Sequence, residues 1–178
     1  MEFNRDKFKA LTHYIIWRAG HRDGFGATKL NKVLWFADAR SYMMYRRPIT
    51  GATYLREKHG PVPREMMAVR DELTREGLVA ISREPYFSGE ITKFKALDAP
   101  DVSQFSQEEM NLIDWWIKHV DEDHTATSVS ELSHDYMWEL ARMGEEIPLY
   151  AVFASRIRAP LGKELEWAKA EAERLGLQ

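Results

Sequence analysis

Residues 29–63 read KLNKVLWFADARSYMMYRRPITGATYLREKHGPVP and hold the strongest structural signals in the chain. Their first half is rich in aromatic residues and repeats apolar side chains at helical spacing, which predicts an amphipathic helix. Pro48 predicts the end of that helix, because proline lacks an N–H and disfavours helical geometry at the residue before it. A short strand is expected over residues 52–59, where threonine and tyrosine are frequent at the start.

The Gly-Pro-Val-Pro sequence at residues 60–63 predicts a turn that fixes this strand against a third helix. Two prolines and a glycine reduce the entropy of the unfolded chain and preset the turn. Pro63 suits the first position of a helix, where its missing N–H would have no partner anyway. The inner face of that helix is predicted to consist of Val62, Met66, Val69 and Leu73. Gly77 is expected to end it in a left-handed conformation.

The remaining patterns predict an α+β fold, mostly helical, in a single domain over residues 1–178. Two further strands are expected near 78–83 and 91–97, and with the strand at 52–59 they would form one small antiparallel sheet. The order of elements in residues 1–98 is that of a winged helix, an analogy of fold order only. Residues 103–160 read as a helical half. An apolar stripe over 161–178 predicts a C-terminal helix that docks on the body or on a second chain.

Sequence signals for helix starts occur at three places outside this central stretch. Asn4 or Asp6 can cap a first helix, because a side-chain oxygen of either residue can accept from a free N–H of the first turn. Ser106 with Glu109 and Ser128 with Glu131 both match the capping-box pattern. Each box predicts the start of a helix in the second half of the chain.

Composition places the chain among globular proteins and excludes several kinds of chemistry. It has 178 residues, of which 44% are hydrophobic and 12% aromatic, enough for one domain with a proper core. It contains no cysteine, which excludes disulfides, thiol catalysis and zinc sites built on thiolates. The N-terminus shows no signal-peptide pattern, and no apolar run approaches the length of a membrane span. A soluble cytoplasmic protein is expected.

Charge is distributed unevenly along the chain. Residues 1–70 hold 14 Lys/Arg against 6 Asp/Glu, a net of +8, and residues 71–178 hold 11 against 22, a net of −11. Such a split is compatible with an acidic partner at the N-terminal half. It is also explained by mutual attraction of the two halves inside one compact domain, which is the interpretation we favour.

Three segments share their residue order with one known family. The first two read K-L-x-K-x-x-x-F-A-D and R-P-I-T-G-x-x-Y, and the third is G-P-V-P. A later L-S-H-x-x-x-W runs from Leu132 to Trp138. The chain thereby resembles the Panacea domain, the SocA-like antitoxin family, over residues 29–138, although Trp35 stands where a smaller aromatic is frequent. The resemblance implies a protein that neutralises a toxin encoded beside it, generally by direct protein contact, and that carries no cofactor. The motif positions expected to be structural are Lys29, Asp38, Pro48, Gly51, Gly60, Pro61, Pro63, His134 and Trp138.

No pattern in the sequence predicts a catalytic or metal site, so we expect neither an enzyme nor a cofactor. His119 and His124 flank an acidic run, but five residues do not make one helical turn. Ser133, His134 and Asp135 are adjacent, whereas a catalytic triad needs side chains that converge in space. The carboxylate of Asp38 lies on an otherwise apolar helix, so we expect it to be ion-paired or hydrogen-bonded.

Two functions of different classes follow from these observations. The first is an antitoxin that binds a protein toxin encoded nearby through aromatic residues with polar ends and neighbouring arginines, namely Tyr42, Tyr45, Arg46, Arg47, Tyr54 and Arg56. The second is a winged-helix DNA-binding regulator. The expected recognition helix, residues 63–76, has a net charge of −1, with three arginines against four acidic residues. Phosphate contacts need a net basic helix, which disfavours DNA. The identity of the toxin, the mode of neutralisation and a possible homo-oligomer stay open.

Overall fold

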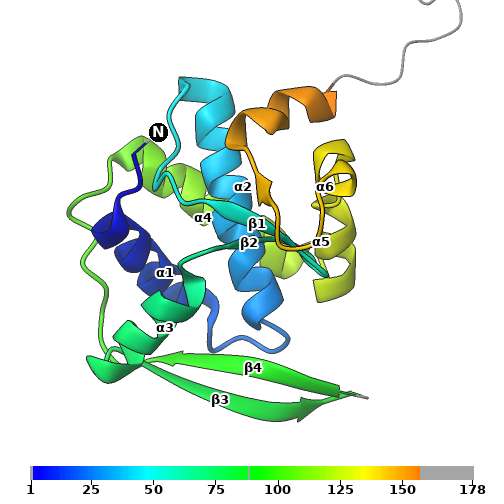
Figure 1. The fold of residues 1–178 in the computed structure, drawn as a ribbon. Helices are drawn as coiled ribbons and strands as arrows, with labels where there is room; N and C mark the ends of the chain where they lie inside the picture. The colour runs from blue at the N-terminus through cyan, green and yellow to red at the C-terminus, as the bar shows by residue number, and fades with distance from the viewer. Residues whose placement is uncertain (1, 88, 157–178) are drawn as a thin grey trace, which may run out of the picture.

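Helix α2 (Ala27–Tyr45) is the central element of the computed structural model, which describes residues 2–87 and 89–156 (Figure 1). Helix α1, helix α4, strand β2, helix α5 and the 3-10 helix η1 all pack against it. The helix ends where Arg46 adopts a left-handed conformation, two residues before Pro48. The described elements are α1 (Arg5–Ala19), α2, β1 (Tyr54–Glu57), β2 (Gly60–Pro63), α3 (Met66–Arg75), β3 (Val79–Tyr86), β4 (Gly89–Ala96), α4 (Gln107–Glu122), α5 (Ala126–Leu132), α6 (Tyr136–Leu140), β5 (Glu146–Ile147) and η1 (Leu149–Arg156).

The predicted fold class is confirmed: the protein is α+β, mostly helical, with small antiparallel sheets. Its core is formed mainly by apolar residues of α1, α2 and α4, which include Phe8, Leu11, Ile15, Leu30, Val33, Leu34, Ile113, Ile117 and Val120. None of the helices in the described ranges is both long and apolar enough to cross a lipid bilayer.

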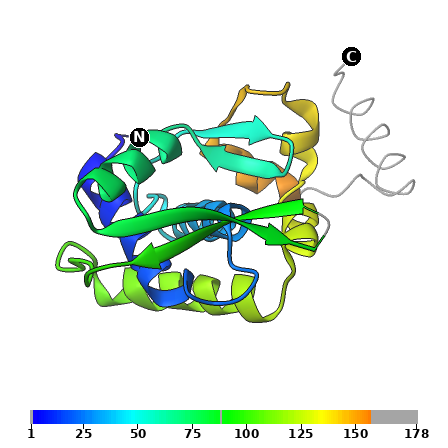
Figure 2. The same cartoon turned by 90° about the horizontal axis from the view of Figure 1, so that it is seen from below.

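The arrangement of the strands differs from the single three-stranded sheet that the sequence predicts. Strand β1 pairs with β2 on one side and with β5 on the other, and among the described strands β3 pairs with β4 in a separate sheet (Figure 2). The predicted turn at residues 60–63 is itself strand β2, and the turn that precedes it is Lys58–His59. Pro63 therefore lies in a strand and does not begin α3. Proline is tolerated in β2 because it is an edge strand, where a missing N–H costs no ladder hydrogen bond.

Local signals placed several helix ends correctly. The side chain of Asn4 accepts a hydrogen bond from the Lys7 N–H and caps α1, and Ser106 with Glu109 forms the capping box of α4. Gly77 has a φ of +72°, and the next N–H, that of Leu78, donates back to the Leu73 carbonyl. This is the hydrogen bond that closes a helix after a left-handed residue. The inner face of α3 consists of three of the four predicted residues, Met66, Val69 and Leu73. The fourth, Val62, lies in strand β2, because the helix begins only at Met66.

The second half of the chain is anchored on the first. Helix α4 packs along α2, and β5 adds its two residues to the edge of β1. The capping box predicted for Ser128 with Glu131 is wrong, because Thr125 caps α5 together with Ser128, three residues earlier. The C-terminal helix predicted over residues 161–178 lies outside the described residues.

Candidate functional site

A buried carboxylate ties the loop after α2 to the middle of that helix. Asp38 is fully buried and accepts hydrogen bonds from the Thr50 N–H at 2.8 Å, the Thr50 hydroxyl at 2.6 Å and the Tyr54 hydroxyl at 2.8 Å. Burial raises the pKa of Asp38, and the hydrogen bonds from Thr50 and Tyr54 oppose that rise. The carboxylate is hydrogen-bonded, one of the two arrangements expected from the sequence. Two motif segments, F-A-D and R-P-I-T-G-x-x-Y, thus meet at Asp38.

The tyrosine of this cluster is not a surface residue. Tyr54 is 1% exposed, and its ring packs edge-on against Trp35 with 4.9 Å between centroids. The prediction that Tyr54 contacts a partner is therefore wrong. Its ring is part of the core, and its hydroxyl is used by Asp38. Gly51, between Thr50 and Tyr54, has a φ of +71° and lies against the backbone of Glu2, so a side chain there would be strained.

Two lysines of the K-L-x-K motif are buried beneath the surface. Lys29 donates to the Asp121 carbonyl at 2.9 Å, and the Asp121 carboxylate also pairs with Arg22 at 2.5 Å. Lys32 is 1% exposed, and the partner that its ammonium has among the described residues is the Pro61 carbonyl at 3.3 Å. Burial lowers the pKa of Lys32 to about 7. These bonds tie α2 to α4 and to β2.

The L-S-H-x-x-x-W motif folds against the same region. The rings of His134 and Trp138 stack with 3.7 Å between centroids, and the guanidinium of Arg56 lies 4.3 Å from the centre of the Trp138 ring. Burial lowers the pKa of His134, and the charges of Lys32 and Arg56 lower it further. Arg56 is half-buried against Trp138 and is not part of an open surface with the residues at the end of α2. Its predicted role in partner contact is not supported by this position.

The other predicted contact residues gather at the C-terminal end of α2. Tyr45 is 48% exposed, and Arg47 is exposed as well. Tyr42 is half-buried against Phe153 of η1, and the Arg46 guanidinium lies 4.2 Å from the centre of the same ring. These four positions form one accessible end of the helix, and the structure separates them from Arg56.

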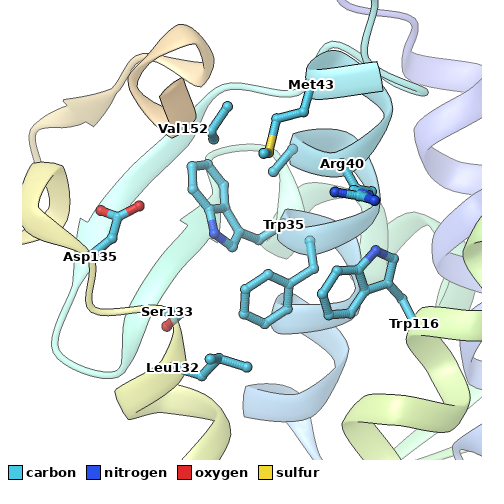
Figure 3. A pocket seen from close by; sticks show the side chains of 10 residues that line it. Trp35, Arg40, Met43, Trp116, Leu132, Ser133, Asp135 and Val152 are labelled. Atoms are coloured by element: carbon cyan, nitrogen blue, oxygen red, sulfur yellow. The ribbon is translucent and has the colours of Figure 1, made fainter. Parts of the chain in front are cut away.

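Beside this end of α2 lies an apolar groove of about 390 Å³ (Figure 3). Its floor is a face of α2, and α4, the α5–α6 connection and η1 line its sides. Phe36 stacks on Trp116 with 4.6 Å between ring centroids and an interplanar angle of 15°. Leu132 is 49% exposed at the rim. The lining residues are Trp35, Phe36, Ala39, Arg40, Met43, Trp116, Leu132, Ser133, Asp135 and Val152.

This groove was not predicted from the sequence. One signal was present, because Phe36, Arg40 and Met43 follow one another at the i, i+4, i+7 spacing of a single helix face. The partners of that face come from Trp116, Leu132 and more distant positions, whose proximity no local pattern reveals.

The fold and the groove define a small α+β domain with an exposed apolar surface over its central helix. The chain belongs to the family described as antitoxin SocA-like, Panacea domain, whose model matches residues 30–139. That match includes most of α2, the β1–β2 hairpin and the L-S-H-x-x-x-W motif. Neither the curated proteins nor the solved structures contain a match to this chain.

Proposed function

We propose that this protein is a non-catalytic antitoxin that neutralises a protein toxin in the cytoplasm by binding it directly through the groove over α2. Membership of the SocA-like antitoxin family supports the antitoxin role. The groove itself is the observation that supports this mode of binding. It places Phe36, Met43 and Leu132 at an accessible surface, where large apolar side chains anchor protein interfaces.

The end of α2 extends this surface. Tyr45, Arg46 and Arg47 are exposed beside the groove, and tyrosine and arginine are frequent among residues that dominate binding energy. The revised contact surface therefore keeps Tyr42, Tyr45, Arg46 and Arg47, without Tyr54 and Arg56.

The test uses the protein encoded by the adjacent open reading frame as the toxin. Leu132→Glu places a carboxylate at the groove rim, and it should abolish rescue of cells that express the toxin and raise Kd by about thirtyfold or more. Leu97→Glu is the matched control, since Leu97 is 54% exposed and follows β4, outside the groove. The proposed surface would be contradicted if Leu132→Glu still rescued the cells, or if both variants lost rescue to the same extent.

A DNA-binding regulator is the second candidate, because α1, α2, α3 and the β3–β4 hairpin follow the order of a winged helix. The charge of the α3 segment argues against it, and Arg70 on α3 lies over the Phe94 ring at 5.0 Å instead of projecting freely. A neighbouring product that is not toxic, together with a shift of the gene's own promoter DNA at physiological salt, would favour the regulator.

A further inference from the structure

The groove over α2 has different chemistry at its two sides. Arg40 stands on one side and Asp135 on the other, with the apolar floor between them (Figure 3). The Asp135 carboxylate already accepts a hydrogen bond from the Trp138 N–H at 2.9 Å. Arg40 is exposed, and within the described ranges it has no carboxylate within ion-pair distance. Arg40 is therefore the charged residue of the groove lining for which no partner is seen among the described residues.

A second unused donor lies on the same side of the groove. The indole nitrogen of Trp116 is buried and has no hydrogen-bond partner in the part of the chain that the structure describes. Figure 3 shows this nitrogen at the edge of the Trp116 ring that faces Arg40. Buried N–H groups are normally hydrogen-bonded, and one without a partner calls for an explanation. Because this nitrogen is buried, an acceptor can reach it only if a neighbouring side chain moves, and we take the exposed Arg40 beside it in Figure 3 to be that side chain.

We propose that this side of the groove binds a carboxylate of the partner protein, which bridges the Arg40 guanidinium and Trp116 Nε1. A large apolar side chain next to that carboxylate lies on the floor formed by Phe36 and Met43. The occupant is thus a segment of a protein in which an Asp or Glu adjoins a large apolar residue. In taking that protein to be the toxin, the inference rests on the proposed function.

The charge around the groove agrees with this partner. Arg46 and Arg47 continue the positive surface from Arg40 to the end of α2, and within the described ranges neither forms an ion pair within 4.0 Å. Clustered positive charge steers an acidic partner, and a charge pair enclosed by apolar side chains adds specificity. A planar guanidinium beside an indole N–H suits the planar carboxylate group.

The first experiment tests the groove without any toxin. The probes are 3-phenylpropionate and 3-phenylpropanamide, which share the apolar ring and differ in the charge of the polar end. The indole N–H signal of Trp116, assigned through Trp116→Phe, is followed by NMR during titration at neutral pH. We expect the carboxylate, but not the amide, to move this signal downfield, and Arg40→Gln to weaken the effect about tenfold. Equal shifts with both probes, or no shift, would overturn the inference.

The second experiment uses the purified product of the adjacent gene. Arg40→Glu should raise its Kd at least about tenfold, whereas Arg75→Glu is the matched control, since Arg75 is an exposed arginine of α3 with the same change in net charge. A single Asp or Glu→Lys change in the partner should restore binding to the Arg40→Glu protein.

The outcomes separate this inference from the proposed function. In one outcome, the wild-type protein binds and neutralises the toxin, and Arg40→Glu and Arg75→Glu weaken the binding equally. That result would overturn the carboxylate site and leave the antitoxin function standing. In another outcome, the Trp116 signal shifts with the carboxylate probe alone, but the wild-type protein does not neutralise the toxin. That result would support the carboxylate site and show that the toxin is not its ligand. Cross-linking that places residues 157–178 of the same chain in the groove would also overturn the inference.

Discussion

The ammonium group of Lys32 occupies the space that a Cβ atom on Gly60 would need. The Ser133 hydroxyl, just after α5, occupies the same space and lies even closer to that Cβ position. Three motif segments, on α2, on β2 and after α5, therefore meet at a point where only hydrogen atoms fit. Gly60 also has a φ of +97°, which side chains rarely adopt.

Replacing Gly60 by Val should lower the free energy of unfolding by about 1–3 kcal/mol, from backbone strain together with the clash against Lys32 and Ser133. Gly89→Val is the matched control, because a Cβ atom at Gly89 would meet nothing within 4 Å and its φ is not positive. Urea denaturation of both variants gives the comparison. A Gly60→Val protein as stable as the parent would show that neither the strain nor the close approach matters.

Removing the Asp38 carboxylate should destabilise the fold strongly. Asp38→Ala leaves the Thr50 N–H, the Thr50 hydroxyl and the Tyr54 hydroxyl without their acceptor, and we expect a loss of about 3 kcal/mol or more. Tyr54→Phe removes one donor and keeps the ring against Trp35, so it should cost about 1–2 kcal/mol. A double-mutant cycle by chemical denaturation measures the coupling. Additive losses in the double variant would contradict a direct bond between the two side chains.

Stability should depend on pH through Lys32. Burial lowers the pKa of Lys32 to about 7, whereas in the unfolded chain the group keeps its usual pKa near 10.5. Between these values the unfolded state binds the proton and the folded state does not, so stability rises with pH. From pH 7 to pH 9 the wild type should gain about 2 kcal/mol relative to Lys32→Met.

The control for this prediction is the pH profile of Lys32→Met itself, which retains every other titrating group. Free energies of unfolding measured at pH 6, 7, 8 and 9 supply the difference. Parallel profiles for the two proteins would mean that Lys32 stays charged in the folded state.

Two tyrosines close in sequence should respond in opposite ways to truncation. Tyr45 is 48% exposed, so Tyr45→Ala should weaken rescue from the toxin while the free energy of unfolding changes by less than about 0.5 kcal/mol. Tyr54 is buried, so Tyr54→Ala should cost about 3–5 kcal/mol of stability. Plating efficiency and thermal melts of both variants provide the test. Full rescue by Tyr45→Ala would show that the end of α2 is not part of the contact surface.

The sequence by itself was sufficient for features that depend on neighbours within about one helical turn. Asn4, the Ser106–Glu109 capping box and the left-handed Gly77 ended or began helices where predicted. The inner face of α3 followed from helical periodicity. Asp38 was expected to need an ion-pair or hydrogen-bond partner because a lone carboxylate on an apolar helix is costly. Each of these features depends on residues a few positions apart, so it can be predicted from the order of residues alone.

Features that join distant segments were decided only by the tertiary structure. Tyr54 carries the polar end typical of a contact residue, yet its burial follows from the position of Asp38 and Trp35, 16 and 19 positions before it. Two-residue strand β5 became visible only through its pairing with β1. The groove needs α2, α4 and η1 in place together. Whether an aromatic side chain lies in the core or on a binding surface depends on which distant element covers it, and that is a property of packing that local periodicity does not encode.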